Sequence, residues 1–414
     1  MSNEMITRRA SLLGLAGATV LAGMAGRVTL ALAAAPTSRR FVVVILRGAL
    51  DGMAAVPPYG DPALIGLRGG LVPAAVGQPD GMFDLGGFYG LHPSLANLHA
   101  MYAANELLIV HAVAGPYRSR SHFEAQDYLE SGADHRMTSG WLNRAVAALP
   151  PDPAAAASGG PALAIGTGVP LLLRGPVMVG SWAPHGAAAP GADLYQQIAS
   201  LNAGDRFTGP AIAEGLRERG FGARTLTAAG ATAGTTAGAD AGDPRLQYTF
   251  PAMARDAGAM LAAPNGPRIT AMEIGGWDTH QAQVGRLTGV LRTLDAGLGA
   301  LKEGLGPAWR QTAVLVMTEF GRTARENGTQ GTDHGTGTVA FVLGGAVQGG
   351  RVLADWPGLS ADRLLDNRDL QPTTDLRAVA KGLLSQHLNL SQAALATVFP
   401  GSAGEASTRG LVRA

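Results

Sequence analysis

The sequence predicts an α/β protein with a doubly wound, mostly parallel sheet between helices. Short apolar runs rich in β-branched residues recur along the chain, and amphipathic helical patterns lie between them. With 414 residues, 46% of them hydrophobic, the chain is long enough to bury a large core. We therefore expect one large domain, or one domain with a smaller cap.

Five apolar runs are expected to form buried strands, because each is apolar on both faces and ends at glycine or polar residues. They span residues 41–46, 107–113, 269–274, 313–318 and 339–343. Helical patterns lie between the runs, at residues 93–104, 250–262, 287–305 and 374–388. In such a sheet, ligands bind beyond the carboxyl ends of the strands, so polar residues at those ends are the first candidates for a site.

Composition excludes several classes of site. The chain has no cysteine, which excludes disulfides, thiolate zinc sites, iron–sulfur clusters and cysteine nucleophiles. A net charge of +1 without a basic run argues against nucleic-acid binding. We find no nucleophile elbow, no zinc-protease helix motif, no Walker loop and no dinucleotide-binding glycine motif, and we predict no organic cofactor.

The N-terminus has the pattern of an export signal. Arg8 and Arg9 precede a moderately apolar, Gly/Ala-rich stretch, which resembles a twin-arginine signal. Small residues at Ala31, Ala33 and Ala35 offer a cleavage site, so residues 1–35 are expected to be removed and residues 36–414 to remain. The predicted location is the periplasm, reached through the twin-arginine translocon and without stable membrane insertion after cleavage. The alternative is an uncleaved membrane anchor. Arg27 interrupts the apolar run, which argues against this alternative.

The middle of the chain is the part whose pattern is hardest to interpret. Residues 151–161 are rich in Ala, Pro and Gly, and residues 225–244 form a low-complexity Ala/Gly/Thr run. We expect a subdomain or a mobile insert at about 150–245.

Two polar clusters follow the first two predicted strands. Asp51 lies in a glycine-rich turn after residues 41–46, where an Asp-Gly pair is also a common turn. Ser119, Arg120 and Ser121 follow residues 107–113. Ser121 has the spacing to Glu124 of a capping box, which predicts a helix over 122–130 with the Ser121 hydroxyl at its positive end.

Three further clusters surround the last strands. Asp278 and His280 are two residues apart after 269–274, a spacing that lets both side chains bind one ion. Glu319 ends the strand 313–318 and needs either a metal or a cation such as Arg322 as its partner. Asp333 and His334 precede residues 339–343, with His334 the candidate ligand and Asp333 a ligand or an orienting group.

The five clusters together predict a metal centre at one edge of the sheet. Its candidate ligands are Asp51, Asp278, His280, Glu319, Asp333 and His334. Oxygen and nitrogen donors without sulfur suit one or two divalent ions of zinc, manganese, calcium or magnesium, and two imidazoles favour a transition metal. We expect six isolated histidines to be structural: His92, His99, His111, His135, His185 and His387.

Six motifs in a fixed order carry a resemblance to a known protein family. They are LRGALDG, SRSHFEAQDYLESG, GGWDTH, MTEFGRTARENG, TDHGTG and the final TTDLRAV…VFPG. The sequence resembles a twin-arginine-exported bacterial family of unknown function, number fifteen-oh-one, of the alkaline-phosphatase-like and sulfatase clan. The resemblance spans nearly the whole chain after the signal. It implies an alkaline-phosphatase-like sandwich with a metal centre at the strand ends, and it implies no particular substrate.

The resemblance also implies roles for individual residues. Asp51 is similar to the aspartate that binds metal beside the nucleophile, and Ser121 falls near the nucleophile position, with Ser119 as its rival. Asp278, His280, Glu319 and His334 match other ligand positions. Phe320 stands where the clan's motif has a histidine, so one ligand is lost or is replaced by Asp333.

Two functions follow as expectations. The first is an exported metal-dependent hydrolase of phosphate or sulfate esters, in which Ser121 attacks and Arg120 or Arg322 binds the small anionic substrate. The second is a non-catalytic envelope protein that keeps the phosphatase-like fold, with or without a structural metal.

Overall fold

The strand β1 (Arg40–Leu46) lies at the centre of the architecture. The computed structural model describes residues 38–150, 161–166, 168–183, 200–201, 212 and 249–413. All seven residues of β1 are buried. Its side chains alternate between two apolar cores, with Val42, Val44 and Leu46 in one and Phe41, Val43 and Ile45 in the other. A strand that is buried on both faces requires helices on both sides of the sheet.

The main sheet has the order β10-β4-β9-β8-β1-β7-β5-β6, and β11 pairs with β4. Its other strands are β4 (Leu107–Ala114), β5 (Ala162–Ile165), β6 (Gly180–Trp182), β7 (Ile269–Ile274), β8 (Thr312–Thr318), β9 (Thr338–Leu343), β10 (Arg351–Leu353) and β11 (Thr374–Asp375). A separate antiparallel pair joins β2 (Phe83–Asp84) to β3 (Gly90–Leu91). The prediction of a mostly parallel sheet is confirmed.

The direction of β9 has a consequence for the site. This strand is antiparallel to both of its neighbours, β4 and β8, whereas the other pairs in the main sheet are parallel. The amino end of β9 therefore lies at the same edge as the carboxyl ends of β1, β4, β7 and β8. Residues before β9 thus reach the edge at which residues after the other strands emerge.

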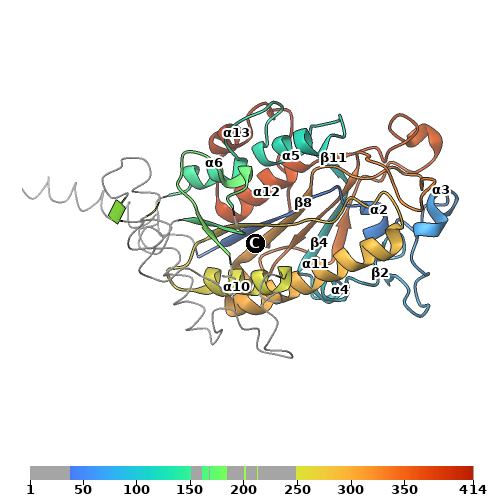
Figure 1. Cartoon of the computed structure of the whole chain (residues 1–414), viewed down its shortest axis with the longest axis horizontal. Coiled ribbons are helices and arrows are strands. Elements are labelled where there is room, and N and C mark those ends of the chain that lie inside the picture. Colours follow the sequence, from blue (N-terminus) through green and yellow to red (C-terminus); the bar gives the residue numbers. More distant parts are fainter. Residues whose placement is uncertain are drawn as a thin grey trace, which may run out of the picture. The chain divides into compact units, whose positions relative to one another are not determined.

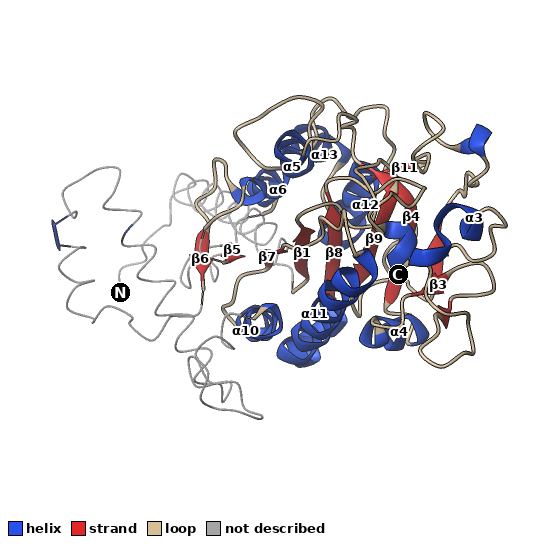
Figure 2. Cartoon of the chain, turned by 45° about the vertical axis from the view of Figure 1, so that its right-hand side comes forward, coloured by secondary structure: helices blue, strands red, loops and turns tan. Residues whose placement is uncertain are grey.

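Helices cover both faces of the sheet, as Figures 1 and 2 show. The first layer comprises α4 (Ala96–Ala103), α10 (Phe250–Ala262) and α11 (Gln283–Leu305). The second comprises α5 (His122–Ser131), α6 (Trp141–Ala148), α12 (Leu376–Leu388) and α13 (Gln392–Val398). Shorter helices are α2 (Gly52–Ala55) and α3 (Leu64–Arg68), with 3-10 turns at Gly69–Leu71, Leu171–Leu173, Gly306–Gln311 and Ala361–Arg363. The doubly wound arrangement of the prediction is confirmed.

The predicted signal peptide at residues 1–35 lies outside the described residues, as does most of the segment at about 150–245. Within that segment, β5 and β6 extend the main sheet beyond β7. Among the described residues, none of the helices has both the length and the apolar character needed to cross a bilayer.

Candidate metal centre

Polar side chains from two loops and one helix meet at the edge formed by the ends of β1, β7, β8 and β9. His122 comes from the first turn of α5, Asp278 and His280 follow β7, and His334 precedes β9. The reversed direction of β9 is what brings His334 to this edge.

Three of these residues lie close enough to share one ion. Nε2 of His334 lies 3.0 Å from Nε2 of His122 and 3.1 Å from Oδ1 of Asp278. The third side of this triangle, from His122 Nε2 to Asp278 Oδ1, measures 3.5 Å. Ligand atoms on a tetrahedral zinc ion with bonds of about 2.0–2.1 Å are roughly 3.3 Å apart, so the triangle has the size that such an ion requires. Among the described residues this is the one such group of three.

His280 adds a fourth donor beside the triangle. Its Nε2 lies 3.0 Å from His334 Nε2 and 3.0 Å from Asp278 Oδ1, so it shares one edge of the triangle. The side chains of His280 and Asp278 are 40% and 47% exposed, which leaves this side of the centre open to solvent.

The other ring nitrogens show where the hydrogens are. Each Nδ1 of the three imidazoles faces an oxygen that only accepts hydrogen bonds, so each Nδ1 carries the hydrogen. The pairs are His122 with Oε1 of Glu319 at 2.8 Å, His334 with the carbonyl oxygen of Arg120 at 3.0 Å, and His280 with Oδ1 of Asp333 at 3.4 Å.

This arrangement aims lone pairs at one another. In the neutral imidazoles, the Nε2 atoms of His122, His280 and His334 present lone pairs to each other and to the carboxylate of Asp278. Two such acceptors can lie 3.0 Å apart when a proton or a metal ion lies between them. A proton can bridge two of them, whereas a metal ion can bind three or four at once. The residues therefore fit a divalent metal ion, and the imidazole majority favours a transition metal over calcium or magnesium.

Asp278 is kept ionised by Arg322. Burial alone would raise the pKa of Asp278, but the hydrogen bond and the charge of the Arg322 guanidinium outweigh it and lower the pKa to about 2. Nη2 of Arg322 donates to Oδ1 of Asp278 at 2.6 Å and to the carbonyl oxygen of Gly48 at 2.7 Å. Arg322 is fully buried and also binds the carbonyl oxygens of Ala49, Trp277 and Thr332. It therefore supports three loops of the site rather than facing a substrate.

Glu319 orients His122. Burial raises the pKa of Glu319, but hydrogen bonds outweigh burial and lower it, the strongest coming from His122. The same bond raises the pKa of His122. Oε1 of Glu319 also accepts from Gly48 N at 2.9 Å and from Gln126 Nε2 at 3.1 Å. Gly48 has φ +119°, and a Cβ there would lie 2.8 Å from Asp278 N, so this close approach of loops requires glycine.

Phe320 forms an apolar wall behind the imidazoles. It is 3% exposed, and its ring lies 4.9 Å from that of His122, nearly parallel, and 5.1 Å from that of His334. The structure places His122 at the centre, so an imidazole from α5 is present although Phe320 occupies the motif position of a histidine.

The six predicted ligands have different surroundings. Asp278, His280 and His334 come together as expected, while Glu319 and Asp333 lie behind imidazoles as hydrogen-bond acceptors.

Asp51 lies away from this group. It is fully buried, its two carboxylate oxygens bind Arg68 at 2.8 and 2.9 Å, and it caps α2 through Ala54 N. This ion pair gives Asp51 a structural environment in place of the expected place beside the nucleophile.

The predicted catalytic residues flank the centre. Ser121 is the N-cap residue of α5, as expected, but its hydroxyl makes no capping bond, and Glu124 instead accepts from the hydroxyl of Tyr117. The predicted capping box is therefore wrong. Arg120 pairs with the buried carboxylate of Asp369 at 2.7 Å and with Asp366 at 3.5 Å. Arg322 pairs with Asp278 and not, as the sequence suggested, with Glu319.

His122 is the member of the candidate ligand group that the sequence did not predict. The signal was available, because His122 follows Ser121 in a polar cluster after a predicted strand. The sequence pattern was interpreted as the start of a helix. No local feature of the sequence indicates that the His122 side chain, in the first turn of α5, contacts the loop after β7.

No curated protein matches the chain. The family described as "Protein of unknown function (DUF1501)" matches residues 104–399, which is more than half of the chain. The chain belongs to this family. Membership agrees with the resemblance seen in the sequence motifs, and it supplies no activity.

Several solved structures are similar at low identity. The C-terminal periplasmic domain of EptC from Escherichia coli, in complex with zinc, is 8% identical, with 75% of this chain and 73% of that chain covered and a TM-score of 0.32. A phosphonate monoester hydrolase of Agrobacterium radiobacter is 12% identical, with 85% and 74% covered and a TM-score of 0.34. At these TM-scores the likeness carries no argument about the site.

Proposed function

We propose that this protein binds one divalent transition-metal ion and uses it to hydrolyse phosphate or sulfate esters. The supporting observation is the triangle of His122, Asp278 and His334, in which lone pairs converge while each imidazole is held from behind. His280 lies beside one edge of the triangle on the solvent side, next to the position that a bound water or substrate would take. Three protein ligands with an accessible further position are the pattern of catalytic rather than structural zinc sites.

Such an ion would polarise an ester oxygen and lower the pKa of a bound water or hydroxyl group. The chain's own residues fix the donors. Arg322 keeps Asp278 ionised and in place, Glu319 orients His122, and Phe320 keeps water from the rear of the imidazoles. Each contact acts before any substrate arrives, so the donors need little reorganisation to bind.

Ser121 is the proposed nucleophile. It lies next to His122, at the N-terminus of α5, where the helix dipole stabilises an anionic oxygen. Its hydroxyl is not used for capping, and the residue is partly exposed. Ser119 is the rival in the same loop. Arg120 is the better placed of the two predicted arginines to contact an anion, because its side chain is partly exposed, whereas Arg322 is fully buried.

The second candidate function is a non-catalytic protein with a structural metal. The observation that favours it is the engagement of both arginines, since Arg322 is fully buried and Arg120 is paired with Asp369. In that case the ion joins the loops around β1, β7, β8 and β9 and performs no reaction.

Metal analysis followed by activity assays distinguishes these functions. The protein is purified without a histidine tag, its metal content is measured, and aryl phosphate, phosphodiester and aryl sulfate substrates are tested. We expect one bound divalent ion per chain and ester turnover that Asp278→Ala and Ser121→Ala abolish. Bound metal without turnover supports the structural role, and a chain that binds no divalent ion contradicts both candidates.

We also propose export through the twin-arginine pathway to the periplasm, which rests on Arg8 and Arg9 and the apolar stretch after them. Replacing both arginines by lysine should leave the precursor in the cytoplasm. Unchanged periplasmic recovery of the double variant contradicts this route.

A further inference from the structure

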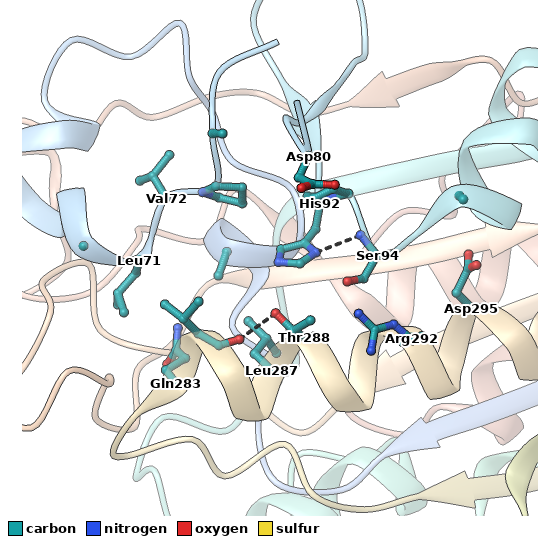
Figure 3. Close-up of a pocket in the computed structure, with 17 residues that line it drawn as sticks. Leu71, Val72, Asp80, His92, Ser94, Gln283, Leu287, Thr288, Arg292 and Asp295 are labelled. Carbon is teal, nitrogen blue, oxygen red and sulfur yellow. Dashed lines mark hydrogen bonds between the residues drawn. The ribbon is translucent and has the colours of Figure 1, made fainter. Parts of the chain in front are cut away.

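A second concave site lies apart from the metal donors. A cavity of about 550 Å³ opens between the first half of α11 and two chain segments, residues 70–74 and 92–96 (Figure 3). Its volume lies in the range of about 300–1,000 Å³ that is common for small-molecule sites. His122, Asp278, His280 and His334 are not among its described lining residues, so a ligand here would be distinct from one at the metal.

His92 presents a hydrogen-bond donor to this cavity. The backbone N–H of Ser94 donates to Nδ1 of His92 at 3.1 Å, so Nδ1 is the acceptor and the ring hydrogen is on Nε2. Burial, together with the charge of Arg292, lowers the pKa of His92 to about 4, which keeps the ring neutral. The residue is 7% exposed. Among the described residues Nε2 has no hydrogen-bond partner, and in Figure 3 it points away from Ser94 on the side of Leu71 and Gln283. A ring donor that lines the cavity and has no protein acceptor favours a ligand that accepts a hydrogen bond.

Arg292 supplies the positive charge. Its side chain extends from α11 toward Ser94 in Figure 3, and its charge lowers the pKa of His92. Arg292 is exposed, and within the described part of the chain its guanidinium forms neither a hydrogen bond nor an ion pair, whereas Arg120 and Arg322 near the metal donors are both paired. An unpaired guanidinium beside a neutral donor is suited to bind a carboxylate in two-pronged fashion.

The remaining lining decides which anion fits. Leu71, Val72, Pro73 and Leu287 make one side of the cavity apolar. Of the two acidic residues, Asp295 is already used, because it accepts from Asn97 N at 3.0 Å and Leu98 N at 2.9 Å at the start of α4. Asp80 is exposed and adds a negative charge. One free cation near one free anion disfavours a phosphate dianion and favours a singly charged ligand with an apolar body.

We propose that this cavity binds a small organic monocarboxylate, whose carboxylate contacts Arg292 and Nε2–H of His92 and whose apolar body packs against Leu71, Val72 and Leu287. The site shares none of the metal donors, so carboxylate binding can be measured apart from the proposed esterase chemistry; Gln283, which contacts the donor loops, lines its edge. Recognition rests on one charge-assisted contact, one neutral hydrogen bond and burial of apolar surface.

Matched pairs of ligands test the charge. Octanoate and phenylacetate are titrated into the full-length protein by calorimetry, beside octanamide and phenylacetamide, which have the same bodies without the charge. We expect the carboxylates to bind at least tenfold more tightly than their amides. We also expect the imidazole Nε2–H signal of His92 to shift in nitrogen-15 spectra on addition of carboxylate, which locates the binding.

Matched variants test the location. Arg292→Gln should remove the preference for carboxylate over amide, while Arg286→Gln, an exposed arginine on the same helix that does not line the cavity, should keep it. His92→Phe should weaken carboxylate binding with the metal content unchanged. The proposal is overturned if neither carboxylate binds, if amides bind equally well, or if Arg292→Gln and Arg286→Gln behave alike.

Discussion

The imidazole of His122 reaches the candidate metal centre from α5, and its replacement tests the proposed donor set directly. We expect His122→Ala to lower zinc affinity by about 100-fold or more, because losing even a group that only orients a ligand costs 10–100-fold. Competition with a chromogenic chelator measures this change. His135→Ala is the matched control, since His135 is exposed and bonded to Asp134. Equal affinities for the two variants would exclude His122 as a ligand.

Glu319 lies behind His122, and its role can be separated from that of a ligand. Glu319→Gln keeps the shape but removes the charge that holds the Nδ1 hydrogen. We expect zinc affinity to fall about 10–100-fold. The absorption spectrum of the cobalt-substituted variant should remain that of the wild type, because the donor atoms stay the same. A changed spectrum would make Glu319 a direct ligand, as the sequence first suggested.

Sequence reasoning found residue types more reliably than their partners. It identified Asp278, His280 and His334, because each stands at the end or start of an apolar run and chelating side chains there have few other uses. It assigned Asp51 to the metal because strand ends collect ligands. Arg68, which binds Asp51, lies on a separate short helix, and no local sequence pattern predicts that ion pair. Long-range pairing of charges is the information that a single sequence lacks.

At the scale of elements, the first residue of α11 joins the two loops that carry the donors. Oε1 of Gln283 accepts from the hydroxyls of Thr279 at 3.0 Å and Thr332 at 2.7 Å, and its Nε2 donates to Asp51 at 2.6 Å. Thr279 lies between two donors, and Thr332 closely precedes His334. Gln283 is thereby a positioning residue for both loops.

We expect Gln283→Met, which fills similar space without hydrogen bonds, to lower the free energy of unfolding by about 2–4 kcal/mol, because buried polar groups lose their partners. Zinc affinity should fall as well, since Asp278 and His334 are no longer held in register. Urea unfolding and chelator competition measure the two effects. Gln281→Met changes an exposed neighbour and should alter neither quantity. Loss of stability with unchanged zinc affinity would show that Gln283 does not position the donors.

Strand positions were predictable at this scale, but strand direction was not. The five predicted strands match β1, β4, β7, β8 and β9 to within a residue at each end, because apolar, β-branched runs bounded by glycine are distinctive. The reversal of β9 depends on the loop from Glu319 to Gly337, whose sequence does not specify direction. Short strands such as β5, β6 and β10 lack enough apolar periodicity to stand out.

For the whole molecule, the metal ion is expected to act as a cross-link, because its donors come from chain segments as far apart as residues 122 and 334. Binding to the folded state alone raises stability by roughly 4 kcal/mol at a free metal concentration 1,000 times the Kd. Chelation should therefore lower the Tm of the wild type by several degrees. The Tm of His122→Ala should respond much less, and an equal response would mean that the ion binds elsewhere.

Three buried neutral histidines outside the candidate metal centre make the stability of the whole molecule depend on pH. Burial lowers the pKa of His92, His111 and His387 from 6.5 to about 4. Between these pKa values the unfolded chain binds protons at these histidines and the folded chain does not, so their contribution to stability is constant above about pH 6.5 and falls as the pH drops toward 4. From pH 7 to pH 5 each histidine contributes a loss of about 2 kcal/mol.

His387→Gln isolates one of these contributions. Nε2 of His387 lies 2.9 Å from the carbonyl oxygen of Arg40, and glutamine can donate there without taking up a proton. Urea unfolding of the metal-free protein at pH 7, 6 and 5 should show a fall that is about 2 kcal/mol smaller in the variant than in the wild type. Protonation of the metal donors is common to both proteins and cancels in the comparison. Parallel pH curves would mean that His387 accepts its proton in the folded state at an ordinary pH, and that burial beneath β1 does not hold it neutral.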